Sequence, residues 1–196
     1  MTNLAKGLGA LLVGTGALEA LRAVLAGLYV AGVLPETAGA LGYGGLTVLG
    51  WAASLALFVG LAGFSYRAAT NVRAWEPDFH QSPVGAAVGW FVPVWNLYKP
   101  YDALCSVWSG SAIALDADEP RGPTRIVEAF WATWALSILV GRLFGAGEAL
   151  ANPGDVAAAA LSAVACGLGA VVVLRIGQLQ DEVAYARTTA NAGSSR

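Results

Sequence analysis

One segment separates the apolar stretches of this chain into two pairs, and it reads Ser82-Pro-Val-Gly-Ala-Ala-Val-Gly-Trp-Phe-Val-Pro-Val-Trp-Asn-Leu-Tyr-Lys-Pro-Tyr101. Its apolar part, residues 84–95, would be roughly 18 Å long as a helix, about half of the hydrocarbon thickness of a bilayer. Pro93 interrupts this part, and Asn96 and Pro100 follow it. We therefore expect a broken element over residues 84–109 that re-enters the membrane or lies on it, packed against helices that satisfy its backbone.

The stretches on either side of this element are long and apolar enough to cross a bilayer. They predict membrane spans over residues 8–34, 46–66, 126–150 and 156–176, followed by a polar tail over 177–196. The fold class is therefore all-α, a polytopic membrane helical bundle with four transmembrane helices, forming a single domain over residues 1–196. A cleaved signal peptide in place of the first span, and a fifth span at 84–115, are the rival interpretations.

Composition supports the membrane assignment. The chain is 57% hydrophobic and 12% charged, with a mean hydropathy of +0.60, which leaves too little polar surface for a water-soluble globule of this size. A net charge of −2 provides no basic field for nucleic acid. Cys105 and Cys166 belong to no CxxC pair or Cys/His cluster, so the sequence predicts no zinc site, no disulfide and no cofactor.

The distribution of basic residues predicts the orientation. If the chain has four spans, one side of the membrane carries Lys6, Arg67, Arg73, Lys99, Arg121, Arg125, Arg175, Arg187 and Arg196. The loops around residues 35–45 and 151–155 carry none. The positive-inside rule then places both termini and the central loop in the cytoplasm. The Ala-, Gly- and Val-rich composition, with Arg preferred over Lys, is typical of a GC-rich bacterial genome, so we expect a multi-pass protein of the bacterial inner membrane.

Several motifs together resemble a known family. They are Tyr66-Arg67-Ala-Ala-Thr-Asn71, Ser82-Pro83, the stretch from Gly89 to Tyr101, Trp108, and the pair Trp131 and Trp134. This combination resembles the DUF4328 family of bacterial membrane proteins of unknown function, over about residues 45–180. The resemblance implies an architecture but no chemical activity.

Three ionisable residues fall within the predicted spans: Glu19 and Arg22 in the first and Arg142 in the third. Charged groups at this depth are costly and usually face the bundle interior in pairs. Glu19 and Arg22 are three residues apart and share a helix face. An ion pair of Glu19 with Arg22 or Arg142 that fixes helix register is one interpretation, and a proton or ion relay is the other.

A second set of polar and aromatic residues surrounds the broken element. Arg67 and Asn71 lie one helical turn apart where the second span ends, and could hydrogen-bond the carbonyls exposed at Pro93–Asn96. Helix capping and the positive-inside rule are the first explanation for both residues. The functional hypothesis is a cytoplasm-facing pocket for a lipid headgroup or small amphiphile. Its candidate residues are Arg67, Asn71, Trp90, Pro93, Asn96, Pro100 and Tyr101.

Other residues offer little chemistry. His80 follows Glu76 and Asp78 in a loop, and we expect a surface histidine there, because zinc would need several further ligands. Gly141-x-x-x-Gly145 favours close helix packing, within one bundle or in a homodimer.

Three classes of function remain. The sequence favours a non-enzymatic membrane module, such as a scaffold, an accessory subunit or a lipid-binding subunit, because it contains no nucleophile–base set or phosphate loop. The alternatives are a small transporter or channel that uses Glu19, Arg22 and Arg142, and an enzyme acting on a lipid or quinone. Glu128 and Asp102 are the plausible carboxylates for the enzyme.

Overall fold

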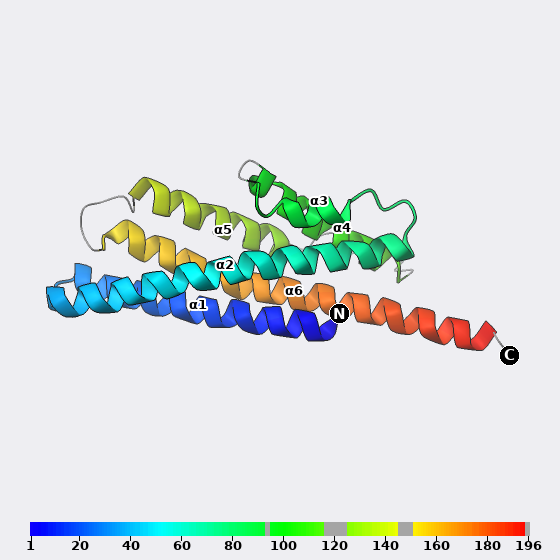
Figure 1. Ribbon diagram of the computed structural model, residues 1–196, viewed down its shortest axis with the longest axis horizontal. Coiled ribbons are helices and arrows are strands. Elements are labelled where there is room, and N and C mark those ends of the chain that lie inside the picture. Colours follow the sequence, from blue (N-terminus) through cyan, green and yellow to red (C-terminus); the bar gives the residue numbers. More distant parts are fainter. Residues whose placement is uncertain (93–94, 116–124, 145–150, 195–196) are drawn as a thin grey trace. The chain divides into compact units, whose positions relative to one another are not determined.

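The computed structural model describes residues 1–92, 95–115, 125–144 and 151–194, and this part of the chain is helical with no strand. The elements are α1 (Thr2–Val30), α2 (Glu36–Trp75), α3 (Pro83–Val88), the 3₁₀ turn η1 (Trp95–Leu97), α4 (Lys99–Ile113), α5 (Arg125–Phe144) and α6 (Pro153–Ser194) (Figure 1). Four of the described helices, α1, α2, α5 and α6, are long and apolar enough to cross a membrane. The all-α fold class with four such helices is confirmed.

The helix ends differ from the predicted span ends for local reasons. α1 stops at Val30, before the predicted span end at residue 34, because Gly32 adopts a positive φ of 70°. The Val33 amide then donates to the Leu28 carbonyl and the Gly32 amide to the Tyr29 carbonyl, which is a Schellman ending. α2 begins ten residues before the predicted position 46, at Glu36. The predicted end of the third span, residues 145–150, lies outside the described residues.

α6 continues through the region predicted as a polar tail. Ile176, Leu179 and Val183 are 0%, 8% and 0% exposed and recur at helical spacing. This buried stripe gives the helix a packing partner as far as Val183; residues 184–190 are exposed, and the helix ends at Ser194.

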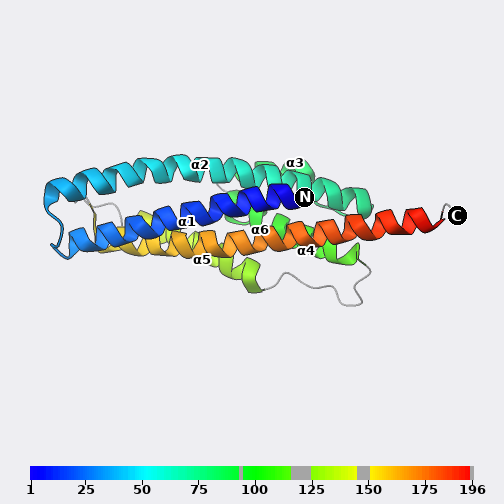
Figure 2. The same ribbon diagram turned by 90° about the horizontal axis from the view of Figure 1, so that it is seen from below.

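The chain divides into two compact units. Unit 1 contains Met1–Gly9, Phe58–Glu128 and Val171–Arg196, and unit 2 contains Ala10–Leu57 and Ala129–Ala170. In unit 1 the first turns of α1 lie beside the second half of α6 (Figure 2). Their approach is so close that a Cβ on Gly177 would lie 2.5 Å from the Cβ of Ala5. The single-domain interpretation stays a prediction.

Unit 2 buries many small residues and exposes many large apolar ones. Ala159 and Ala165 are buried, and Gly141 faces Ala158 closely enough that an added Cβ would lie 3.5 Å from its methyl group. Trp51, by contrast, is 75% exposed, and Val48 is 70% exposed. An apolar exterior of this kind suits contact with lipid and not with water. A homodimer through Gly141 stays a prediction, and Gly145 lies outside the described residues.

Candidate functional site

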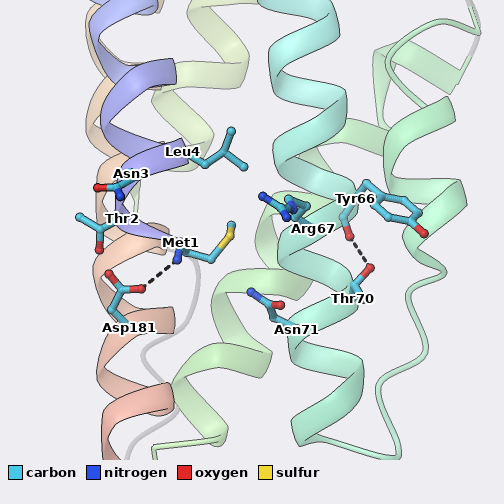
Figure 3. Close-up of a pocket in the computed structure, with 9 residues that line it drawn as sticks. All are labelled: Met1, Thr2, Asn3, Leu4, Tyr66, Arg67, Thr70, Asn71 and Asp181. Carbon is cyan, nitrogen blue, oxygen red and sulfur yellow. Dashed lines mark hydrogen bonds and ion pairs between the residues drawn. The ribbon is translucent and has the colours of Figure 1, made fainter.

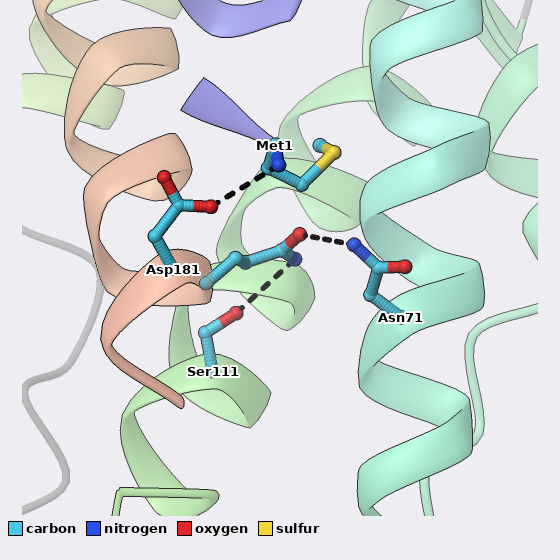
Figure 4. A network of polar contacts seen from close by, with 5 residues as sticks. Met1, Asn71, Ser111 and Asp181 are labelled. Atoms are coloured by element: carbon cyan, nitrogen blue, oxygen red, sulfur yellow. Dashed lines mark hydrogen bonds and ion pairs between the residues drawn. The ribbon is translucent and has the colours of Figure 1, made fainter. Parts of the chain in front are cut away.

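A buried glutamine joins three helices inside unit 1. Gln180 of α6 is 1% exposed, and its Nε2 donates to the Ala68 carbonyl of α2 at 3.0 Å and to Ser111 Oγ of α4 at 3.4 Å. Its Oε1 accepts from Asn71 Nδ2 of α2 at 2.9 Å. Figure 4 shows Asn71 and Ser111 on different helices, with dashed lines for these hydrogen bonds. Both ends of the amide are therefore satisfied, which fixes its orientation.

A pocket of about 620 Å³ opens beside this network in unit 1 (Figure 3). It lies between the start of α1, the last turns of α2 and the second half of α6, and its lining residues are Met1, Thr2, Asn3, Leu4, Tyr66, Arg67, Thr70, Asn71 and Asp181. The amino group of Met1 pairs with Asp181 Oδ1 at 3.1 Å. The volume of the pocket falls within the range of small-molecule pockets.

Arg67 lines this pocket and forms no ion pair within the described part of the chain. Its side chain is exposed and extends from α2 toward the first turn of α1 (Figure 3). It is also the first charged residue of α2 after Glu36. The pocket therefore presents an unneutralised guanidinium where the apolar part of α2 ends.

The structure distributes the seven predicted residues over several places. Arg67 and Asn71 line the pocket, and Trp90, Asn96, Pro100 and Tyr101 are not among its lining residues. Pro93 lies outside the described residues. The amide of Asn71 donates to Gln180, 109 positions away, and among the described residues of the broken element no carbonyl accepts from it.

Trp90 and its neighbours pack elsewhere in unit 1. Trp90 is 2% exposed, and its Nε1 donates to Ser65 Oγ at 3.1 Å. Pro100 is buried in the first turn of α4. Tyr101 is half-buried. The Oδ1 of Asn96 is buried and has no hydrogen-bond partner among the described residues.

The sequence matches the family model of a domain of unknown function (DUF4328) over residues 36–178. The chain belongs to the DUF4328 family. The expected extent of about 45–180 agrees closely with this match. No curated protein and no solved structure matches the chain.

The DUF4328 match covers only part of the polar site. Arg67, Asn71 and Ser111 lie within the matched residues, and Gln180 and Asp181 follow just after them. Sequence reasoning missed Gln180 and Ser111. The available signal was position: Gln180 occupies the stripe that Ile176 and Val183 otherwise keep apolar, and a polar residue in such a stripe needs a partner.

A second pocket of about 440 Å³ in unit 1 is acidic. Its lining residues are Glu76, Asp78, Phe79, His80, Gln81, Asp102, Ser106, Ser109, Gly110 and Ile113. Two of the carboxylates are paired, Glu76 with Arg187 at 3.6 Å and Asp102 with Lys99 at 3.3 Å. His80 is exposed, and no group of residues suited to a metal ion occurs in the part of the chain that the structure describes.

The thiol of Cys105 lies in α4, the helix that contributes Asp102 and Ser106 to this pocket. Burial raises the pKa of this thiol, a hydrogen bond with Tyr101 lowers it in part, and the carboxylates of Asp102 and Glu128 raise it further. The same hydrogen bond raises the pKa of the Tyr101 hydroxyl. A thiol kept neutral in this way is a poor nucleophile at neutral pH.

In unit 2 the DUF4328 chain pairs two of the three charged residues that fall within the predicted spans. Arg22 Nη2 lies 3.0 Å from Glu19 Oε2, and both side chains are largely buried. Gly50 of α2 faces this pair so closely that an added Cβ would lie 3.0 Å from Glu19 Oε1. Arg142 is exposed in the last turn of α5. Of the two partners considered for Glu19, Arg22 is therefore the one that pairs with it.

Proposed function

We propose that this protein is a non-enzymatic membrane module that binds an anionic amphiphile, with the headgroup in the pocket at Arg67. The observation that carries the proposal is the exposed guanidinium of Arg67, without an ion pair in the described chain, in a pocket of about 620 Å³. A planar guanidinium binds phosphate through two parallel hydrogen bonds.

The surrounding groups support an amphiphilic ligand. Thr70 and Asn71 lie on α2 beside Arg67 and provide hydroxyl and amide groups for a polar headgroup. On the N-terminal side of Arg67, α2 is free of charge as far back as Glu36. A ligand with a charged head and an apolar tail would thus find a partner for each part on the same helix.

In this proposal the pocket faces the cytoplasm, and both termini lie on that side. The basic residues Lys6, Arg67 and Arg175, from three helices of unit 1, are all exposed, in keeping with the positive-inside rule. The transporter alternative has less support because Glu19 already pairs with Arg22. The enzyme alternative has less support because Asp102 pairs with Lys99 and Glu128 is exposed.

The test is native mass spectrometry of the protein extracted with its own lipids, comparing wild type with Arg67→Ala and Arg73→Ala. Arg73 lies on the same helix, is also exposed, and does not line the pocket. We expect a phospholipid adduct on wild type and Arg73→Ala that is lost from Arg67→Ala. Equal adducts on all three proteins would refute the site.

A further inference from the structure

The element between α2 and α4 has two unlike faces. Ala86 and Trp90 are 0% and 2% exposed, whereas Val84, Val88 and Phe91 are 60%, 40% and 54% exposed. The Phe91 and Val92 amides both donate to the Val88 carbonyl, so helical turns continue past the end of α3. Residues 84, 88 and 91 therefore lie on one side at i, i+4 and i+7. We call Val84, Val88 and Phe91 the outer face.

Contacts of Trp90 fix the position of this element along the axis of α2. Its indole donates to Ser65 and packs edge-on against the ring of Phe58, with centroids 6.2 Å apart. At a rise of 1.5 Å per residue, Ser65 and Phe58 lie about 3 and 14 Å before Arg67 along the helix axis. Trp90 therefore lies beside the final turns of the charge-free segment of α2.

Basic residues mark where that segment meets the headgroups. Lys6 of α1 and Arg175 of α6 are exposed, and the close approach of Ala5 and Gly177 brings these two helices together near both residues. Leu8 of α1 in turn faces Gly60 of α2, where an added Cβ would lie 2.8 Å from the leucine. Long cationic side chains at this depth extend toward the headgroups. Trp90 therefore lies at the level along unit 1 where these basic residues predict the boundary between hydrocarbon and headgroups.

From this juxtaposition we infer that the outer face is a lipid-contacting surface lying in the interfacial region of the bilayer. α3 and the turns that follow it as far as Val92 make about 15 Å of helix, which is too short to cross the membrane. Trp95, Tyr98 and Lys99 follow it, residue types that are typical of the membrane interface. An apolar helix face in this region is buried to about 5–10 Å below the headgroups. The sequence predicts that this element either re-enters the membrane or lies on it, and the second of these placements is the one inferred.

The test uses spin labels on the full chain in phospholipid vesicles, with Cys105→Ala and Cys166→Ala removing the native thiols. The labelled variants are V88C and F91C on the outer face. V59C on α2, 58% exposed, is the hydrocarbon control, and D78C in the exposed loop is the aqueous control. Collisions with oxygen report hydrocarbon, and collisions with a water-soluble nickel chelate report water.

We expect both outer-face labels to collide more with oxygen than with nickel, at a depth between those of the two controls. Nickel accessibility equal to that of the loop control would overturn the inference, because the face would then lie in water. A depth equal to that of the α2 control would replace the interfacial placement by a re-entrant one. Immobile labels shielded from both reagents would also overturn it, because they would indicate a protein partner.

Discussion

The clearest quantitative prediction concerns Asn71→Ala. The structure shows one hydrogen bond to Gln180 Oε1, from Asn71 Nδ2 at 2.9 Å. Gln180 is 1% exposed, so water cannot readily replace that donor. A buried acceptor left without a partner costs about 1–3 kcal/mol. Because Asn71 is itself half-buried, little packing is lost, and we expect the free energy of unfolding to fall by about that amount.

Two further variants sharpen this prediction. Asn71→Asp places a carboxylate against Gln180 Oε1, and the glutamine amide cannot turn over, because its Nε2 already donates to the Ala68 carbonyl. We therefore expect a larger loss than for alanine. Thr70→Ala is the control, since the Thr70 hydroxyl is exposed and donates to Tyr66 O within its own helix. It should change the unfolding free energy by less than about 0.5 kcal/mol.

The measurement is reversible unfolding by SDS in mixed micelles, followed by circular dichroism. In a Gln180→Leu background, Asn71→Ala should cost much less, because the acceptor it leaves unpaired has been removed. Equal unfolding curves for Asn71→Ala and Thr70→Ala would show that the bond contributes nothing. An undiminished cost of Asn71→Ala in the Gln180→Leu background would show that Asn71 acts through another contact.

The remaining predictions concern a charge pair and a thiol. Arg22→Ala leaves Glu19, which is 6% exposed, without its ion-pair partner, and should lower the unfolding free energy by about 3–5 kcal/mol. Arg142→Ala should change the unfolding free energy by less than about 0.5 kcal/mol. Equal effects of the two variants in the same assay would contradict the pairing of Glu19 with Arg22. Burial raises the pKa of Cys105, so in a Cys166→Ala background a maleimide should react slowly with the folded protein at pH 8 and faster above the usual thiol pKa. In that alkaline range the folded state also loses stability, because the Cys105 thiol ionises at a lower pH in the unfolded chain than in the folded one. Alkylation of the folded protein at the rate of a small free thiol would contradict the raised pKa of Cys105.

Much of the architecture follows from the sequence alone. A charge-free run such as the one between Glu36 and Arg67 satisfies its backbone only as a helix in an apolar medium. The family resemblance rests on residue types and their spacing along the chain, so it can be recognised without knowledge of the tertiary structure. Arg67 was likewise identifiable as the first cation after an apolar run, which marks a membrane boundary in most spanning helices.

The partners of the polar residues were decided only by the tertiary structure. Asn71 pairs with Gln180 across 109 positions, and Trp90 donates to Ser65 on another element. Both pairings depend on the rotation and relative height of packed helices, which a hydrophobic pattern does not encode. Glu19 pairs with Arg22 and not with Arg142. Arg22 lies one turn from Glu19 on the same helix, whereas a pair with Arg142 would depend on how α1 and α5 face each other. The sequence thus determines which segments are helical and apolar, and the packing of those helices determines which polar groups meet.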